Sequence, residues 1–211
     1  MAEKISKAVL KRLPVYLSYL KSLGDDAPEH ISATTLAAAL DMGEVQVRKD
    51  LAMVSDGGRP KVGYRRAALI ADIEQFLGYD NTNLAVLIGA GKLGRALMGY
   101  RGFSEYGMEI VAGFDSKLTK ATTDDSGKPI LPMSELKRLC LERKILIGII
   151  TVPTEHAQAV CDELISYGIR AIWSFAPAHL DVPAGTLVQY ENMATSLAVL
   201  SKHLSAQLKG Y

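Results

Sequence analysis

The chain has 211 residues, of which 48% are hydrophobic and 22% charged, a composition typical of a globular protein and not of a disordered one. The formal net charge is only +1, so any surface that binds nucleic acid has to be a local feature. The N-terminal segment has no apolar signal core, and the longest apolar runs, 84–88 and 145–150, are too short to cross a bilayer. We therefore expect a cytoplasmic protein that makes no membrane contact.

The only two cysteines are Cys140 and Cys161, and their spacing is not that of metal ligands. A chain of this size with two thiols is typical of a reducing compartment. We expect both side chains to be buried on helices as small apolar groups, and we predict no metal site.

The first 80 residues alternate helices with turns. An apolar stripe of helical period runs from residue 3 to residue 23, and Pro14 predicts a kink or a fresh helix start within it. A polar loop covers 24–29, and Ser32 is the expected N-cap of the next helix. Three further helices are predicted, over 33–40, 44–54 and 67–77. Turn residues at 56–61 and a short returning strand at 62–64 complete the order of a winged helix.

Basic residues concentrate in the predicted third helix and the wing. Residues 45–66 hold six basic side chains and two acidic ones, a local net charge of 6 − 2 = +4. Gln and Arg in the first turns of a recognition helix can pair with adenine and guanine, while cations at a wing tip suit the minor groove or its phosphates. The alternative is a solvated basic face without a ligand. We predict that double-stranded DNA is contacted by Ser32, Gln46, Arg48, Lys49, Arg59 and Lys61.

From residue 83 onward, short apolar strands alternate with helices. Strands are expected at 84–88, 109–114, 144–151, 170–175 and 187–190, with a polar, turn-rich segment over 116–132. Helices are expected at 92–99, 134–142 and 155–167. This alternation predicts an α/β Rossmann domain, a doubly wound parallel sheet covered by helices on both faces. The domains are then a winged-helix domain at 1–80, the Rossmann domain at 83–190 and a C-terminal dimerisation helix at 191–211.

A glycine-rich G-x-G-x-x-G motif follows the first strand of this second half and opens a helix. Gly89 allows the tight turn, Gly91 admits a pyrophosphate to the backbone, and Gly94 lets the helix approach the strand. Asp115 ends the next strand, 115 − 94 = 21 residues later, where a carboxylate binds the adenosine ribose and repels a 2′-phosphate. The sequence therefore favours NAD(H) over NADP(H); the alternative is a glycine turn without a ligand. The motif consists of Gly89, Ala90, Gly91, Lys92, Leu93 and Gly94.

No catalytic residue is predicted. A dehydrogenase holds a general acid or base beside the nicotinamide, and the second half is too short for a substrate domain. His156 has the pattern of an ordinary cap or surface histidine. Tyr100 is the better-placed side chain, at the end of the motif helix, so the site fits binding and not turnover.

The segment 192–208 has an apolar stripe of helical period. A partner subunit and the chain's own Rossmann domain are both places where it could be buried. The stripe consists of Met193, Leu197, Leu200, Leu204 and Leu208.

Several motifs, in the right order along the chain, resemble the Rex family of redox-sensing repressors. The stretch Gln46–Leu51 resembles its recognition helix, and Val62–Tyr64 resembles the segment that follows its wing. The resemblance continues through the glycine motif, Tyr100–Phe103, Phe114–Asp115 and Glu191–Asn192. It also includes two short segments that add cofactor-binding residues to the prediction, Thr151, Val152, Pro153, Phe175, Ala176 and Pro177.

The resemblance implies a homodimer whose C-terminal helices are swapped between subunits. It implies a repressor that binds operator DNA with NAD⁺ and is released by NADH, with Tyr100 near the nicotinamide. The two oxidation states differ by one positive charge and in ring planarity, so a site can prefer one of them without chemistry.

The chain departs from the family at two positions. Ser18 stands where the family has an arginine and Ala194 where it has an aspartate, two groups that form an ion pair remade between the two states of the family's switch. The segment 53–56 also replaces a Tyr-Phe-Gly run before the wing. The departures predict weaker discrimination between NADH and NAD⁺, or a changed signal.

Two other functions fit parts of the sequence. A DNA-binding regulator that senses a CoA thioester is suggested by Thr151–Pro153 and the helix after it, although Asp115 suits a ribose with free hydroxyls. A small NAD-dependent oxidoreductase fits the glycine motif but not the basic wing.

Overall fold

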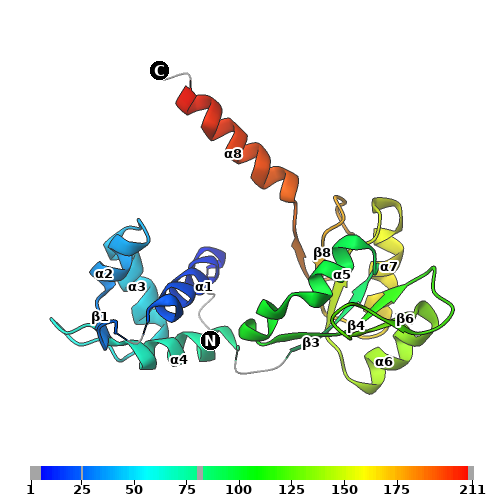
Figure 1. Cartoon of the computed structure of the whole chain (residues 1–211), viewed down its shortest axis with the longest axis horizontal. Helices are drawn as coiled ribbons and strands as arrows, with labels where there is room; N and C mark the ends of the chain where they lie inside the picture. Colours follow the sequence, from blue (N-terminus) through cyan, green and yellow to red (C-terminus); the bar gives the residue numbers. More distant parts are fainter. Residues whose placement is uncertain (1–5, 25, 80–82, 209–211) are drawn as a thin grey trace. The chain divides into compact units, whose positions relative to one another are not determined.

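The computed structural model describes residues 6–24, 26–79 and 83–208 (Figure 1). The chain divides into two compact units, Met1–Asn81 and Thr82–Tyr211. Each unit has its own hydrophobic core, so each is built around a separate set of buried side chains.

The N-terminal unit is a winged helix. It contains the helices α1 (Lys7–Ser22), α2 (Ala33–Ala39), α3 (Glu44–Val54) and α4 (Arg66–Leu77). Two short antiparallel strands, β1 (His30–Ile31) and β2 (Tyr64–Arg65), join the start of α2 to the start of α4. One core holds the helices together, and its fully buried members include Leu13, Tyr16, Leu36, Leu51, Leu69 and Ile73.

The two strands of this unit differ from the sequence prediction. The returning strand begins at Tyr64, two residues later than predicted, and the earlier residues form a tight turn closed by an Arg59–Gly63 bridge. Its partner β1 was not predicted, because two residues carry no alternation that a sequence pattern could reveal.

Helix α1 runs without a break through Pro14, so no fresh helix begins there. A proline inside a helix removes one backbone hydrogen bond, here the bond to the Leu10 carbonyl, and destabilises the helix by about 3 kcal/mol. The flanking leucines, Leu13 and Leu17, are almost completely buried. Their burial stabilises α1 by roughly 1.5–3 kcal/mol each, which offsets the lost bond.

The second unit is built on a seven-stranded sheet in the order β5-β6-β4-β3-β7-β8-β9. Six strands are parallel, and only β5 on the edge is antiparallel. Without β5 the order is that of the doubly wound dinucleotide-binding folds, so the predicted Rossmann architecture is confirmed. The strands are β3 (Asn83–Ile88), β4 (Met108–Asp115), β5 (Thr122–Thr123), β6 (Pro129–Pro132), β7 (Ile147–Ile150), β8 (Ala171–Ser174) and β9 (Leu187–Tyr190).

Helices cover both faces of this sheet. Helix α5 (Lys92–Gly99) packs on one face through Met98, which belongs to the same core cluster as Leu87 and Ile149. Helices α6 (Leu136–Glu142) and α7 (Thr154–Ser166) pack on the other face. Their cysteines, Cys140 and Cys161, are buried there as expected, and burial raises the pKa of both thiols. Two 3-10 helices complete the unit, η1 (Arg101–Tyr106) and η2 (Met133–Glu135).

The segment 116–132, predicted to be only turns, contains β5 and β6. Strand β6 was not predicted because it has a proline at each end. Proline cannot donate a hydrogen bond to a β-ladder, so within a sheet it occurs at strand ends, and in the sequence it indicated a turn. Asp124 closes the turn between the strands, where its carboxylate accepts from Ser126 and from the Lys128 amide. Burial opposes ionisation of Asp124, but these hydrogen bonds outweigh it and lower its pKa.

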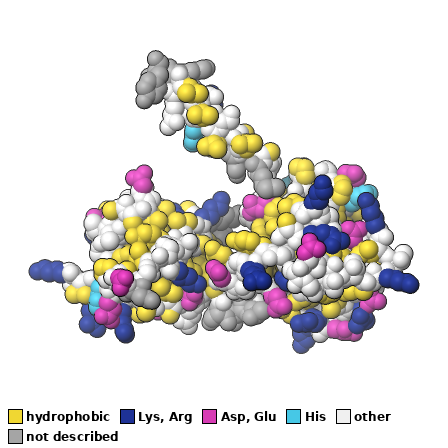
Figure 2. All heavy atoms as spheres, in the orientation of Figure 1, with side chains coloured by type: hydrophobic (Ala, Val, Ile, Leu, Met, Phe, Trp, Pro, Cys, Tyr) yellow, Lys and Arg dark blue, Asp and Glu magenta, His cyan; other side chains and the backbone are white. Residues whose placement is uncertain are grey.

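Helix α8 (Met193–Leu208) ends the described chain with its leucines exposed. Leu197, Leu200, Leu204 and Leu208 are 66%, 64%, 53% and 68% exposed. Figure 2 shows apolar side chains along this helix. The predicted stripe is therefore not buried by the part of its own chain that the structure describes. None of the described helices is both long and apolar enough to span a membrane.

Candidate nucleotide and DNA-binding sites

The glycine motif forms the loop between β3 and α5, at the carboxyl edge of the sheet. Gly89 has a φ of +99°, a backbone conformation that other residues rarely adopt, and its amide donates to the Phe114 carbonyl at 2.8 Å. A β-carbon on Gly94 would collide with the Gly89 carbonyl oxygen, so glycine is required where α5 approaches β3. No atom lies within 4 Å of the β-carbon position of Gly91, the N-cap of α5.

Thr151 fixes this loop to the end of β7. Its amide donates to the Ile88 carbonyl at 2.9 Å, and its hydroxyl lies 3.0 Å and 2.8 Å from the Ile88 and Gly89 carbonyl oxygens. These bonds form a hydrogen-bonded floor between the ends of β3 and β7, the two parallel neighbours at which the strand order of the sheet reverses. Ligands of doubly wound sheets bind at this switch point, outside the carboxyl ends of the strands.

A cavity of about 670 Å³ opens beside this floor. It brings Gly89 and Gly91 together with Asp115, Thr151, Val152 and Pro153, all predicted from the sequence. The described lining also includes Ile88, Ser116, Lys117, Met133, His156, Ala159, Val160 and Glu163.

Half of the described lining residues that the prediction missed lie on one face of α7. His156, Ala159, Val160 and Glu163 recur at intervals of three, one and three, so they share a helix face. The spacing was visible in the sequence, but only the fold places that face beside Gly91.

Asp115 retains capacity to bind a sugar. One carboxylate oxygen accepts from the Lys117 amide at 3.0 Å, which orients the side chain at the end of β4. The other oxygen has no partner among the described residues. An ionised carboxylate accepts hydrogen bonds only, so it matches a pair of ribose hydroxyls.

The other predicted cofactor residues are not among the described residues that line this cavity. Tyr100 is 56% exposed and packs edge-on against Phe103, whose ring lies 5.6 Å from that of Trp173. The Trp173 ring in turn lies 4.7 Å from Phe175. These four residues, which we name the aromatic row, lie on the α5 face of the sheet. Lys92 and Leu93 lie in the first turn of α5, Ala90 and Ala176 are buried, and Pro177 is exposed.

No described group of three or more His, Cys, Asp or Glu side chains could hold a metal ion.

In the N-terminal unit, α3 presents the predicted DNA-binding side chains to solvent. Gln46, Arg48 and Lys49 are exposed, whereas Val47 and Leu51 on the opposite face are fully buried. Gly43 is the N-cap of α3 and offers no side-chain hydrogen bond. Ser32 is the N-cap of α2 as predicted, and its hydroxyl accepts from the Thr35 amide at 3.0 Å.

The basic side chains of this region divide into paired and unpaired groups. Arg48 is paired with Glu44 one helical turn earlier, and Arg65 with Glu29 at 2.9 Å. Arg66 donates to the carbonyls of residues 23 and 24, so it is a structural group. Three of the six have neither an ion pair nor a side-chain hydrogen bond with any described residue: Lys49, Arg59 and Lys61.

Arg59 and Lys61 are displayed by a tight turn. The Val62 amide donates to the Arg59 carbonyl across Pro60 and Lys61, and Lys61 has a φ of +65°. Proline followed by a residue with positive φ is the pattern of a type II turn, which favours glycine at the position of Lys61. The left-handed conformation costs a lysine roughly 1–2 kcal/mol. The chain nevertheless has lysine at this position, which puts a cation at the tip of the turn.

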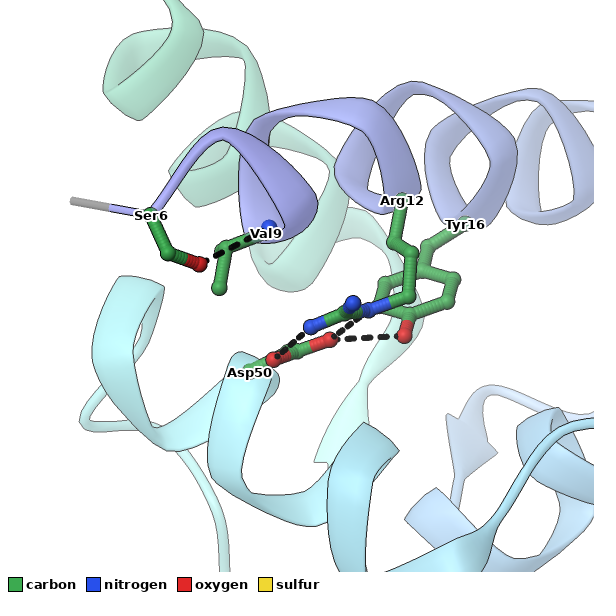
Figure 3. A network of polar contacts seen from close by, with 5 residues as sticks. All are labelled: Ser6, Val9, Arg12, Tyr16 and Asp50. Carbon is green, nitrogen blue, oxygen red and sulfur yellow. Dashed lines mark hydrogen bonds and ion pairs between the residues drawn. The ribbon is translucent and has the colours of Figure 1, made fainter.

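A buried polar network joins α1 to α3 (Figure 3). Arg12 donates from Nε and Nη2 to the two oxygens of Asp50, at 2.7 Å and 2.9 Å, and the Tyr16 hydroxyl donates to Asp50 at 2.8 Å. Asp50 is only 3% exposed, so its charge has to be compensated in place. Burial, and then the Asp50 carboxylate, raise the pKa of Tyr16 to about 12, while hydrogen bonding to Asp50 raises the pKa of Arg12.

Comparison with known proteins matches both units. Residues 4–52 match a family model described as a putative DNA-binding protein N-terminus, and residues 80–178 match one described as a CoA binding domain. A protein of Porphyromonas gingivalis named redox-sensing transcriptional repressor Rex is 40% identical over 203 residues, 96% of this chain and 93% of that protein.

Solved structures of a related protein also match nearly the whole chain. A crystal structure of RSP in complex with β-NAD⁺ and operator DNA matches with a TM-score of 0.87 and 30% identity, over 99% of this chain and 98% of that chain. A structure of RSP in complex with β-NADH matches with a TM-score of 0.86 and 29% identity, over 97% and 96%. RSP is described as a Rex-family repressor.

Proposed function

The chain belongs to the Rex family of redox-sensing transcriptional repressors, and from this premise we propose that it binds operator DNA and is released from it by NADH. The observation that carries the proposal is the presence, in one chain, of a winged helix with unpaired cations and a cavity that joins Gly91 to Asp115. Because its proposed target is operator DNA, we also propose that the protein acts in the cytoplasm.

The residues present fit NAD(H). Open space at Gly91 admits a pyrophosphate to the amides of the first turn of α5, and the free oxygen of Asp115 matches the adenosine ribose. Lys92 and Leu93 would donate from the same turn, and Met133 with Val152 would give the adenine an apolar contact. The aromatic row, with Tyr100 at its exposed end, is the proposed surface for the nicotinamide ring.

The test is DNA binding at fixed salt without nucleotide, with NAD⁺ and with NADH, measured by fluorescence anisotropy on a palindromic Rex-type operator. We expect binding with NAD⁺ and release with NADH. Binding that ignores both nucleotides would contradict the proposal. Trp173, the single tryptophan, lies in the aromatic row and reports nucleotide binding independently of DNA.

Binding rather than turnover is part of the proposal. The relatives are named as repressors, and a repressor binds and releases its effector unchanged. Incubation of NADH with simple carbonyl compounds should leave the NADH unconsumed.

We propose that a second copy of the chain covers the apolar face of α8. Leucines that are more than half exposed along one helix are rare on monomeric proteins and mark a contact surface. A symmetric pair of such helices would bury both stripes together. A swap of α8 between subunits, which the family resemblance implies, is the proposed arrangement.

The exchanges at Ser18 and Ala194 support weaker discrimination between NADH and NAD⁺ than is usual in the family. Both positions are exposed and neither side chain carries charge, so no ion pair can form between them. The double variant Ser18→Arg with Ala194→Asp should sharpen release by NADH, whereas neither single variant should do so. An unchanged ratio of NADH to NAD⁺ effects in the double variant would contradict this proposal.

A CoA thioester is the second candidate ligand, because residues 80–178 match a CoA-binding family model. The 3′-phosphate of CoA would place negative charge on the ribose beside Asp115, which disfavours it. Replacement of Asp115 by Ala should therefore weaken NADH binding, and a CoA ligand would instead bind more tightly to that variant.

A further inference from the structure

Arg12 contacts two residues of α3 that lie one helical turn apart. It holds Asp50 through two hydrogen bonds, and its remaining N–H groups face the side-chain amide of Gln46. The Arg12 side chain is 19% exposed, so it lies beneath the surface that α3 presents.

Only one orientation of the Gln46 amide satisfies both groups. With its oxygen toward Arg12, Oε1 accepts from Nη1 at 2.7 Å and from Nη2 at 3.0 Å. The reverse orientation would place the NH₂ group against the guanidinium, donor against donor. Arg12 cannot rotate away, because Asp50 holds it through two bonds and the Tyr16 hydroxyl shares the same carboxylate (Figure 3).

This contact changes what Gln46 can offer to DNA. A glutamine oxygen has two lone pairs, and both are used by Arg12. The NH₂ group, with its two donors, is left for the exposed side. A free glutamine reads adenine by donating to N7 and accepting from the N6 amino group, and here the acceptor is not available.

We propose that Arg12 is a positioning residue that makes Gln46 a donor-only reader of the major groove. Guanine presents two acceptors there, O6 and N7, and thymine presents the acceptor O4. Cytosine presents only an amino group, and adenine places its amino group beside N7, so one of the two Gln46 donors would face a donor on adenine. The base pair under Gln46 is therefore selected for a keto base over an amino base. This inference rests on the proposed DNA-binding function and replaces the adenine contact that the sequence alone predicts for glutamine.

The test uses the full-length protein and a library of duplexes with randomised half-sites, enriched by binding in the presence of NAD⁺. The variant Gln46→Ala identifies the base position that Gln46 reads, as the position whose preference disappears. At that position the wild type should enrich guanine or thymine over adenine and cytosine by about tenfold, within the range of one good base contact.

Arg12→Lys is the decisive variant. Lysine still pairs with Asp50 but lacks the fork that holds the amide, so Gln46 becomes free to turn and the keto preference should fall to about threefold or less, with adenine recovered. Gln46→Glu should shift the preference toward amino bases, because a second carboxylate oxygen faces the groove. Lys11→Ala is the matched control: Lys11 precedes Arg12 on α1 with an exposed side chain, and its loss should leave the preference at this position intact. Thermal unfolding of Arg12→Lys checks that the variant is folded.

The outcomes separate the inference from the function on which it rests. Adenine enriched by the wild type at the mapped position would overturn the inference while DNA binding stands. A keto preference that persists unchanged in folded Arg12→Lys would overturn it as well. Absence of any enriched sequence would remove the proposed function, and the inference with it.

Discussion

Replacement of Gly91 by valine separates nucleotide binding from folding. No atom lies within 4 Å of the β-carbon position, and the backbone φ of −73° suits any residue. The change removes a glycine N-cap, so we expect a loss of unfolding free energy of about 1 kcal/mol or less. The added methyl groups would occupy the space through which a pyrophosphate reaches the first turn of α5.

The expected loss in binding is much larger than the loss in stability. Two charge-assisted hydrogen bonds from backbone amides to phosphate contribute about 1.5–3 kcal/mol each. Their loss, about 3–6 kcal/mol, corresponds to a rise in Kd for NADH of roughly 10²- to 10⁴-fold. Calorimetric titration measures this directly, with Trp173 fluorescence as a second signal.

Gly99→Val is the matched control, since Gly99 ends the same helix and its β-carbon would also meet nothing within 4 Å. It should bind NADH as the wild type does. Operator binding by Gly91→Val should persist and ignore NADH. A Kd for Gly91→Val within threefold of the wild-type value would refute the assignment of this loop to the pyrophosphate.

Three further outcomes are expected. Because the pKa of Tyr16 is raised from 10.0 to about 12, the folded chain retains a proton that the unfolded chain has lost, so this stabilisation is full below pH 10 and disappears as the pH rises through about 12. The melting temperature should fall more steeply with pH across that range for the wild type than for Tyr16→Phe. Parallel curves would contradict the raised pKa of Tyr16. Burial raises the pKa of Cys140 to about 11, so thiol reagents should label it only as the protein unfolds; rapid labelling of the folded chain would be inconsistent with this. Leu204→Glu should yield monomers in analytical ultracentrifugation while Lys202→Glu stays dimeric, and an unaffected dimer would show that the α8 stripe is not the interface.

The sequence is most informative where one physical requirement determines one residue type. Gly89 and Gly94 were assigned roles in a turn and in a close helix approach, and a positive φ and a backbone collision account for both. Helix α3 was predicted with its observed bounds, since its buried and exposed positions alternate with helical period. Strand β9 was also predicted with its observed bounds.

Contacts between distant segments were not predictable. Strand β1 exists because His30 and Ile31 pair with β2, about 34 residues later in the chain. The α7 face of the cavity is likewise defined only by its position beside Gly91. The identity of the cations that remain available also depends on tertiary structure. The count of +4 over residues 45–66 treats all six basic side chains alike, whereas three of them are committed to Glu44, Glu29 and backbone carbonyls.

The contact predicted for Gln46 also differs between sequence and structure. Its residue type alone indicates adenine, whereas its neighbours in the fold indicate a keto base. Side-chain type fixes the inventory of donors and acceptors, but neighbours decide which of them remain free. For Gln46 the deciding neighbour is Arg12, 46 − 12 = 34 residues earlier and on another helix, and Arg12 is fixed in turn by the buried carboxylate of Asp50. Base preference in this chain therefore depends on the core of the winged helix as well as on its exposed face, so substitutions beneath α3 should alter sequence selectivity without touching DNA.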